Sequence, residues 1–199
     1  MGQAPENTSQ LEWARGQVAL ALSDVALEIC PAPDNSGLRA GILNRRGEIC
    51  LARTESDRAG NVREALRCFE ESIGTQRENA PACQWAPIHM NLGQAYRQNP
   101  DAKPSENFRK VIDHFESALR GYDEIEDTDL AAEAKMHLGE AHRDRPDGDR
   151  TENLKIAAAF LEKALAVWRE EYDPAGLTRL RADLDGVWNE LMRNSEPVE

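Results

Sequence analysis

A sequence motif recurs three times along this 199-residue chain at a constant spacing of 46 residues. Each copy carries a glycine, an asparagine and a small apolar residue at matched positions. The matched glycines and asparagines are Gly47, Gly93 and Gly139, and Asn61, Asn107 and Asn153. A spacing that holds without insertion across three copies predicts a repeat array, in which each copy packs on its neighbours.

Apolar residues within each copy recur at steps of three and four, which is typical of amphipathic helices. No segment shows the period-two alternation of a half-buried strand. We therefore predict an all-α protein of about eight helices, arranged as antiparallel pairs. The predicted units are a half-repeat at 10–30, repeats at 38–77, 83–124 and 129–172, and a capping helix at 175–192. Residues 10–192 would form one array, with a disordered N-terminus at 1–9 and a polar tail at 193–199.

The two outer helices align with the repeats at the same spacing. Ala19 lies 46 residues before Ala65, so the first helix corresponds to the second helix of a repeat. Trp188 lies 46 residues after His142, so the last helix corresponds to the first helix of a repeat. The apolar residues of the first helix, from Val18 to Ile29, are expected to form one adhesive face.

The matched residues have structural explanations. A glycine inside a helix costs up to ~1 kcal/mol of helix propensity, so it needs a packing reason, and a close crossing of two helices would supply one. The large apolar residues of the second helices would fill that crossing. They are Phe69, Phe115 and Leu161. The matched asparagines are expected to open the second helices and to satisfy loop backbone there.

Composition narrows the classes of partner. A net charge of −12 repels nucleic acid and anionic membrane surfaces and favours basic partners. The alternative explanation is that this charge serves only to keep the protein soluble. No apolar stretch approaches the ~20 residues that span a bilayer. The segment Met1–Gln10 is polar, so no secretory signal is expected. We expect a cytoplasmic protein whose Cys50 and Cys68 are small buried apolar residues rather than disulfide partners.

No motif indicates catalysis. The sequence has no phosphate-binding glycine loop, no dinucleotide fingerprint and no nucleophile elbow. Its four histidines form no H-x-x-x-H pair and none stands at ligand spacing from a cysteine. We expect no catalytic residue, no metal and no cofactor.

The repeat resembles the tetratricopeptide repeat. That pattern is a Leu-Gly pair, a tyrosine three residues after the glycine, and Ala, Phe and Ala in the second helix. Leu92-Gly93, Tyr96, Phe115 and Ala118 match it in the middle copy, whereas His142 replaces the tyrosine in the third. The period of 46, against the usual 34, is similar to an extended variant found in large bacterial proteins. The resemblance implies a right-handed superhelical α-solenoid whose concave groove is lined by the first helices.

The resemblance also implies a partner-binding groove. The family's groove positions fall on Asn44, Glu48, Met90, Gln94, Arg97, Met136, Glu140 and Arg143. Their polar character with two methionines suits a partner peptide or helix, and the carboxylates of Glu48 and Glu140 favour one that carries Arg or Lys. The predicted function is a protein-interaction adaptor. The alternative is a structural or chaperone-like subunit of a larger complex that binds through its convex face or its ends, which could also pair as a homodimer.

Overall fold

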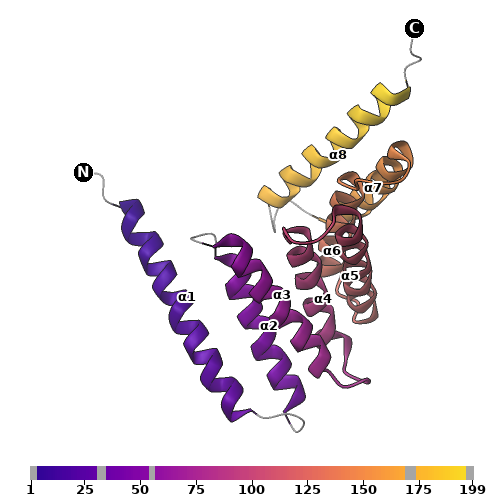
Figure 1. Cartoon of the computed structure of the whole chain (residues 1–199). Helices are drawn as coiled ribbons and strands as arrows, with labels where there is room; N and C mark the ends of the chain where they lie inside the picture. The colour runs from indigo at the N-terminus through magenta and orange to yellow at the C-terminus, as the bar shows by residue number, and fades with distance from the viewer. Residues whose placement is uncertain (1–3, 31–34, 54–56, 169–173, 196–199) are drawn as a thin grey trace. The chain divides into compact units, whose positions relative to one another are not determined.

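A computed structural model describes residues 4–30, 35–53, 57–168 and 174–195 of the chain. Regular structure in these ranges is α-helix throughout, with no strand among them, so the predicted all-α class is confirmed for the described part. Figure 1 shows the helices, which are α1 (Ala4–Ile29), α2 (Ser36–Ala52), α3 (Arg58–Thr75), α4 (Ala82–Arg97), α5 (Pro104–Glu124), α6 (Thr128–Arg143), α7 (Arg150–Leu165) and α8 (Pro174–Ser195).

Helix boundaries differ from the predicted ones mainly at the outer helices. Helix α1 begins at Ala4, inside the segment predicted to be disordered. Helix α7 ends at Leu165, earlier than predicted, and α8 continues to Ser195, into the predicted polar tail. Residues 1–3, 169–173 and 196–199, on which parts of these predictions fall, lie outside the described residues.

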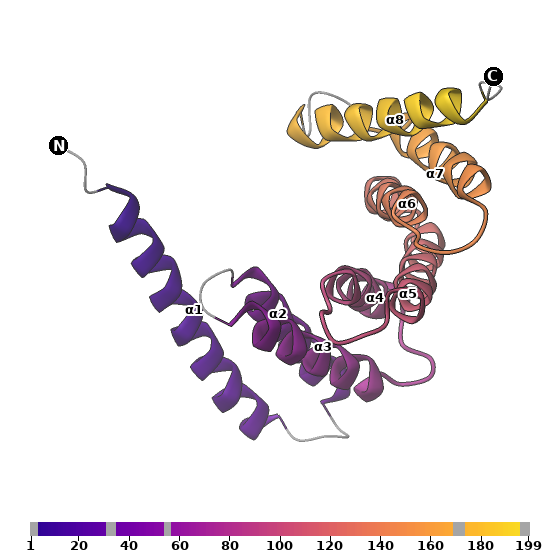
Figure 2. The same cartoon turned by 45° about the horizontal axis from the view of Figure 1, so that its top comes forward.

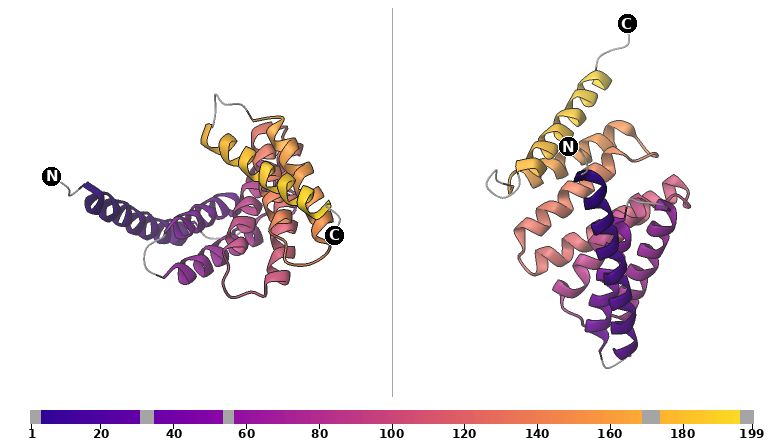
Figure 3. Two further views of the ribbon diagram at one scale, coloured as in Figure 1. Left: turned by 90° about the horizontal axis from the view of Figure 1, so that it is seen from above. Right: turned by 90° about the vertical axis from the view of Figure 1, so that its left-hand side faces the viewer.

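The chain divides into two compact units, Met1–Pro100 and Asp101–Glu199, and the same pairing of helices occurs in each. In the first unit α2 packs on α1, α3 and α4, and α3 packs on α4 (Figure 2). In the second unit α6 packs on α5, α7 and α8, and α7 packs on α8. Figure 3 shows α1 beside α2 in the first unit and α8 beside α7 in the second. Corresponding helices lie two repeats apart, so the repeated sequence folds into repeated pairs.

A close crossing of helices at a glycine recurs in both units. A Cβ atom built on Gly47 of α2 would lie 2.7 Å from Cδ1 of Phe69 in α3, closer than real Cβ contacts. A Cβ atom on Gly139 of α6 would lie 2.6 Å from Cγ of Leu161 in α7. Both large side chains are fully buried. The predicted packing reason for these glycines is confirmed, because each one leaves room for the side chain of the paired helix.

Arginine contacts at the start of the second helices repeat at the same distance along the chain. Arg58, the first residue of α3, contacts the side chain of Gln98, 40 residues later. Arg150, the first residue of α7, forms an ion pair with Glu190, also 40 residues later, at 2.7 Å. Each arginine also donates to a backbone carbonyl seven residues earlier, at the end of the preceding helix. The pairs α2–α3 and α6–α7 therefore each make the same kind of loop contact, in addition to the same packing of their helices.

The matched asparagines do not open their helices, which corrects the prediction. Asn61, Asn107 and Asn153 each stand fourth in the helix. The N-terminal caps of α3 and α7 are Asp57 and Asp149, whose carboxylates accept from backbone N–H groups three residues later. The amides of Asn61 and Asn153 instead donate to carbonyls before the helix, at 3.2 and 2.7 Å. The prediction that these amides satisfy loop backbone is confirmed for Asn61 and Asn153, although they do so from the fourth position of the helix.

Small aliphatic side chains form the core that α6, α7 and α8 share. The buried members of this cluster are Met136, Leu154, Ala157, Ala158, Leu161, Ala164, Leu180, Val187 and Leu191. Both Val187 and Leu191 belong to α8, which therefore covers the pair α6–α7 much as α4 covers α2–α3.

Substituting Gly47 by alanine is expected to lower the free energy of unfolding by about 1–3 kcal/mol, because the new methyl group displaces Phe69 from a filled core. Gly41→Ala in the same helix is the matched control, because a Cβ there meets no atom within 4 Å. The control should gain up to ~1 kcal/mol from helix propensity. Urea unfolding followed by circular dichroism measures both, and equal changes in the two variants would contradict the close crossing.

Candidate functional site

The eight predicted groove residues fall on the first helices α2, α4 and α6, and they differ in accessibility. Five of them are half-buried and present polar atoms at the surface: Asn44, Glu48, Gln94, Arg97 and Arg143. The other three are buried: Met90 and Met136, each 5% exposed, and Glu140, fully buried. The expectation that these three line an open groove is therefore corrected, because their side chains are enclosed within the protein.

Hydrogen bonds order the polar face that α2 and α4 share in the first unit. The amides of Asn44 and Asn91 both donate to Oε1 of Glu48, each at 3.0 Å. The guanidinium of Arg45 donates to Oε2 of the same carboxylate at 2.7 Å. The Asn91 amide also lies 3.0 Å from Oδ1 of Asn44. We call these four residues the α2/α4 polar face, and at its centre a half-exposed carboxylate is fixed in one orientation.

The residue of the second unit that corresponds to Glu48 is Glu140, and its carboxylate is already paired within the protein. Glu140 accepts from Arg179 of α8 through Oε1, and its Oε2 lies 3.1 Å from Nδ1 of His137. Arg143 forms an ion pair with Asp183 of α8, and Asp183 also lies 3.8 Å from Arg179. Sequence reasoning missed this network, although Arg179 and Asp183 stand one helical turn apart on the helix predicted to cap the array.

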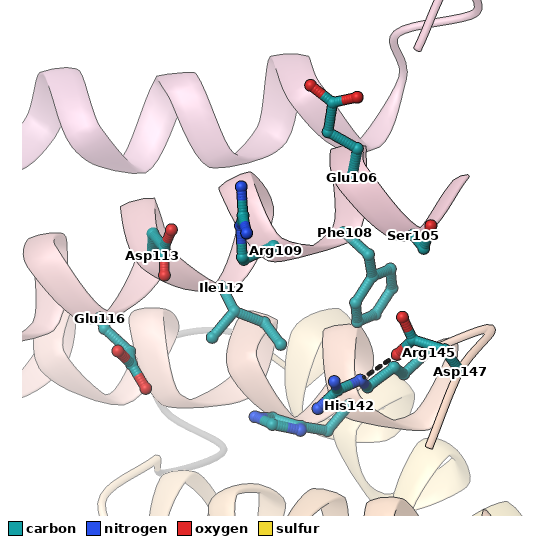
Figure 4. A pocket seen from close by; sticks show the side chains of 10 residues that line it. All are labelled: Ser105, Glu106, Phe108, Arg109, Ile112, Asp113, Glu116, His142, Arg145 and Asp147. Carbon is teal, nitrogen blue, oxygen red and sulfur yellow. Dashed lines mark hydrogen bonds and ion pairs between the residues drawn. The ribbon is translucent and has the colours of Figure 1, made fainter. Parts of the chain in front are cut away.

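A cavity of about 750 Å³ lies between α5 and the end of α6, within the second unit. We call it the α5/α6 cavity. Phe108 and Ile112 of α5 point toward the end of α6, where His142 and Arg145 lie (Figure 4). The remaining lining is polar and charged: Ser105, Glu106, Arg109, Asp113, Glu116 and Asp147. Arg145 donates to Asp147 at 2.6 Å, so one cation of the rim is already neutralised.

The imidazole of His142 lies at the inner wall of the α5/α6 cavity. Its ring stacks on Phe160 of α7, with centroids 5.8 Å apart, and only 7% of the residue is exposed. Its Nδ1 is buried with no hydrogen-bond partner among the described residues. Burial, and secondarily the positive charge of Arg145, hold the pKa of His142 below its usual value. The imidazole is therefore neutral at pH 7.

In the first unit, the position that corresponds to His142 is filled differently. Tyr96 reaches across from α4, and its hydroxyl donates to Glu70 of α3 at 2.5 Å. Burial and this hydrogen bond raise the pKa of the Tyr96 phenol, so it remains a donor. One repeat later, His142 corresponds to Tyr96 and Glu116 corresponds to Glu70. Both His142 and Glu116 line the α5/α6 cavity. The sequence showed that histidine replaces tyrosine, but the space left beside it could only be seen in the structure.

The buried cysteines have no features of a reactive site. Cys50 and Cys68 are buried and free, as predicted, and burial raises the pKa of the Cys68 thiol to about 12. That thiol stays protonated at neutral pH and is a poor nucleophile. Among the described residues, no three His, Cys, Asp or Glu side chains converge as metal ligands would. No described helix has the length and apolar character required to cross a bilayer.

Comparison with known proteins gives no assignment: no family model matches the chain, and a search of curated proteins finds no match.

Acidification is expected to destabilise the protein through His142. Because its folded-state pKa is depressed below the usual 6.5, the unfolded chain binds the proton first as pH falls. The stability contributed by the neutral imidazole is present above pH 6.5 and is lost as pH falls through the lower, folded-state pKa, with a limiting slope of about 1.4 kcal/mol per pH unit. Urea unfolding of the wild type and His142→Phe from pH 7.5 to 5 measures the difference. Parallel pH profiles would contradict this role for the buried imidazole.

Proposed function

We propose that the chain is a protein-interaction module that holds a partner segment bearing Arg or Lys against the α2/α4 polar face. The observation that carries the proposal is the fixed carboxylate of Glu48, which receives three hydrogen bonds from Asn44, Asn91 and Arg45 and remains half-exposed. A carboxylate that is already ordered binds a cationic side chain without a further loss of conformational freedom.

Charge and repeat pattern support the same proposal. The net charge of −12 draws cationic segments toward the protein at low salt. The sequence resembles the tetratricopeptide repeat, in which first helices line the surface that holds peptides, and α2 and α4 are the first helices of their pairs. A superhelical solenoid of that kind is part of the proposal. The buried Met90, Met136 and Glu140 are excluded from the contact surface that we propose.

Glu48→Lys tests the α2/α4 polar face directly. An array of immobilised random peptides should show Arg- and Lys-containing ligands for the wild type, and Glu48→Lys should weaken them at least about tenfold through like-charge repulsion. Glu78→Lys, at an exposed position between α3 and α4, makes the same charge change in the same unit and should leave binding unchanged. An identical set of ligands with identical affinities for all three proteins would rule out this face.

A second candidate function is self-association, and the exposed face of α1 favours it. Val18, Leu22, Val25 and Ile29 are all more than half exposed and form one stripe, as the predicted adhesive face requires. Beside this stripe, a cavity of about 690 Å³ with mainly apolar walls lies between α1 and α2.

The repeat register favours a second copy of the chain as the occupant of this α1 surface. Trp188 of α8 is 42% exposed and corresponds to His142, which stacks on Phe160 in the second unit. Three spacings of 46 separate Phe160 from Leu22, so an apolar contact of Trp188 in one copy with Leu22 in another would stand at the corresponding position of the repeat. Contact between two different surfaces is a head-to-tail association, which forms rings or chains.

Sedimentation velocity over a range of protein concentrations tests the self-association. The wild type should associate, whereas Leu22→Glu and Trp188→Glu should each remain monomeric. An equimolar mixture of the two variants should form a dimer, because each retains one intact surface. Gln17→Glu, an exposed change on α1, is the control and should associate like the wild type. A wild type that is monomeric at every concentration would exclude this candidate, and an unaffected Trp188→Glu would exclude the head-to-tail arrangement.

A further inference from the structure

We infer that the α5/α6 cavity binds the phenol side chain of a tyrosine supplied by a partner segment, with its hydroxyl donating to Glu116. The tyrosine belongs to a protein partner, so this inference rests on the proposed protein-interaction function, and it concerns a contact within the second unit alone.

The precedent is the phenol that the protein supplies for itself in the first unit. Tyr96 is 6% exposed, and its hydroxyl donates to Glu70 across the packed helices α4 and α3. Glu116 of α5 corresponds to Glu70, and His142 of α6 corresponds to Tyr96. An imidazole is shorter than a phenol, so the second unit keeps the acceptor and lacks the donor that reaches it.

The walls of the α5/α6 cavity suit an aromatic ring. Phe108 and Ile112 offer apolar surface from α5 (Figure 4). Both are half-buried, so an inserted ring would cover apolar surface that is now partly exposed. The carboxylate of Glu116 lies one helical turn beyond Ile112 and is exposed, which places an acceptor beside the apolar walls. An apolar ring with one polar tip matches this combination.

Within the described part of the chain, the buried imidazole of His142 has an unsatisfied polar atom at the cavity. Its Nδ1 is buried without a partner among the described residues, and a buried polar atom in that state costs ~1–3 kcal/mol. In the neutral tautomer that carries its proton on Nδ1, the imidazole donates to the oxygen of a ligand phenol, whose own O–H then donates to Glu116. A purely apolar ligand can make neither bond.

The charges of the rim exclude an anionic ligand and therefore a phosphorylated tyrosine. Four carboxylates line the cavity, from Glu106, Asp113, Glu116 and Asp147, against the two cations Arg109 and Arg145. Arg145 and Asp147 pair with each other, which leaves the carboxylates of Glu106, Asp113 and Glu116 against the cation of Arg109. A phosphate brought to this rim would meet more negative than positive charge, whereas a neutral phenol carries no such penalty.

The probe is p-cresol, the tyrosine side chain without its backbone, added to the full chain and followed by the NMR resonances of His142 and Glu116. Saturable shifts at both residues are expected. Toluene, which lacks the hydroxyl, should bind at least about fivefold more weakly, in line with the loss of one hydrogen bond. Glu116→Ala should lower p-cresol affinity by a similar factor and leave toluene unchanged.

His142→Tyr is the decisive variant, because its own phenol would fill the cavity and reach Glu116 as Tyr96 reaches Glu70. It should abolish p-cresol binding while its circular dichroism spectrum stays native. Equal affinities for p-cresol and toluene, or p-cresol binding that survives in a folded His142→Tyr, would overturn the inference. Peptide binding that depends on Glu48 without any p-cresol binding would refute the cavity alone. Binding of p-cresol without any Glu48-dependent peptide would uphold the cavity and refute the α2/α4 polar face.

Discussion

The close contact between a glycine on one helix and a large apolar side chain on the next sets the geometry of each helix pair. At Gly47 and at Gly139 the paired helix brings a side chain into the space that a Cβ atom would need. The distance between the paired backbones is therefore fixed by the smallest residue available. The arginines that begin α3 and α7 hydrogen-bond to the end of the preceding helix, and these bonds require the two helices to lie at that distance.

This constraint explains why the two units share one pairing of helices although their sequences have diverged. Phe69 in the first unit and Leu161 in the second are chemically different, yet both are fully buried against a glycine. Divergence is tolerated where one large apolar side chain replaces another. Where a shorter polar side chain replaces a longer one, as His142 does relative to Tyr96, a cavity lies beside the position.

The sequence predicted the elements of the fold well because periodicity and spacing are local properties. The glycine crossings, the buried cysteines and the correspondence of α8 to a first helix could all be read from matched positions. The groove could not, because accessibility depends on distant residues. Glu140 is buried by Arg179 on α8, and Met136 by a core that α7 and α8 complete. The asparagines were misplaced because each second helix begins three residues before its asparagine, and in α3 and α7 an aspartate caps that earlier start.

A double-mutant cycle between Gly47 and Phe69 tests most directly whether the glycine contact sets the geometry of the pair. Gly47→Ala removes the space, Phe69→Ala removes the side chain that occupies it, and the double variant leaves the new methyl group unopposed. If the contact governs the pair, Gly47→Ala will destabilise the wild type but not the Phe69→Ala background, giving a coupling energy of about 1–3 kcal/mol. Additive effects, with no coupling, would contradict the account.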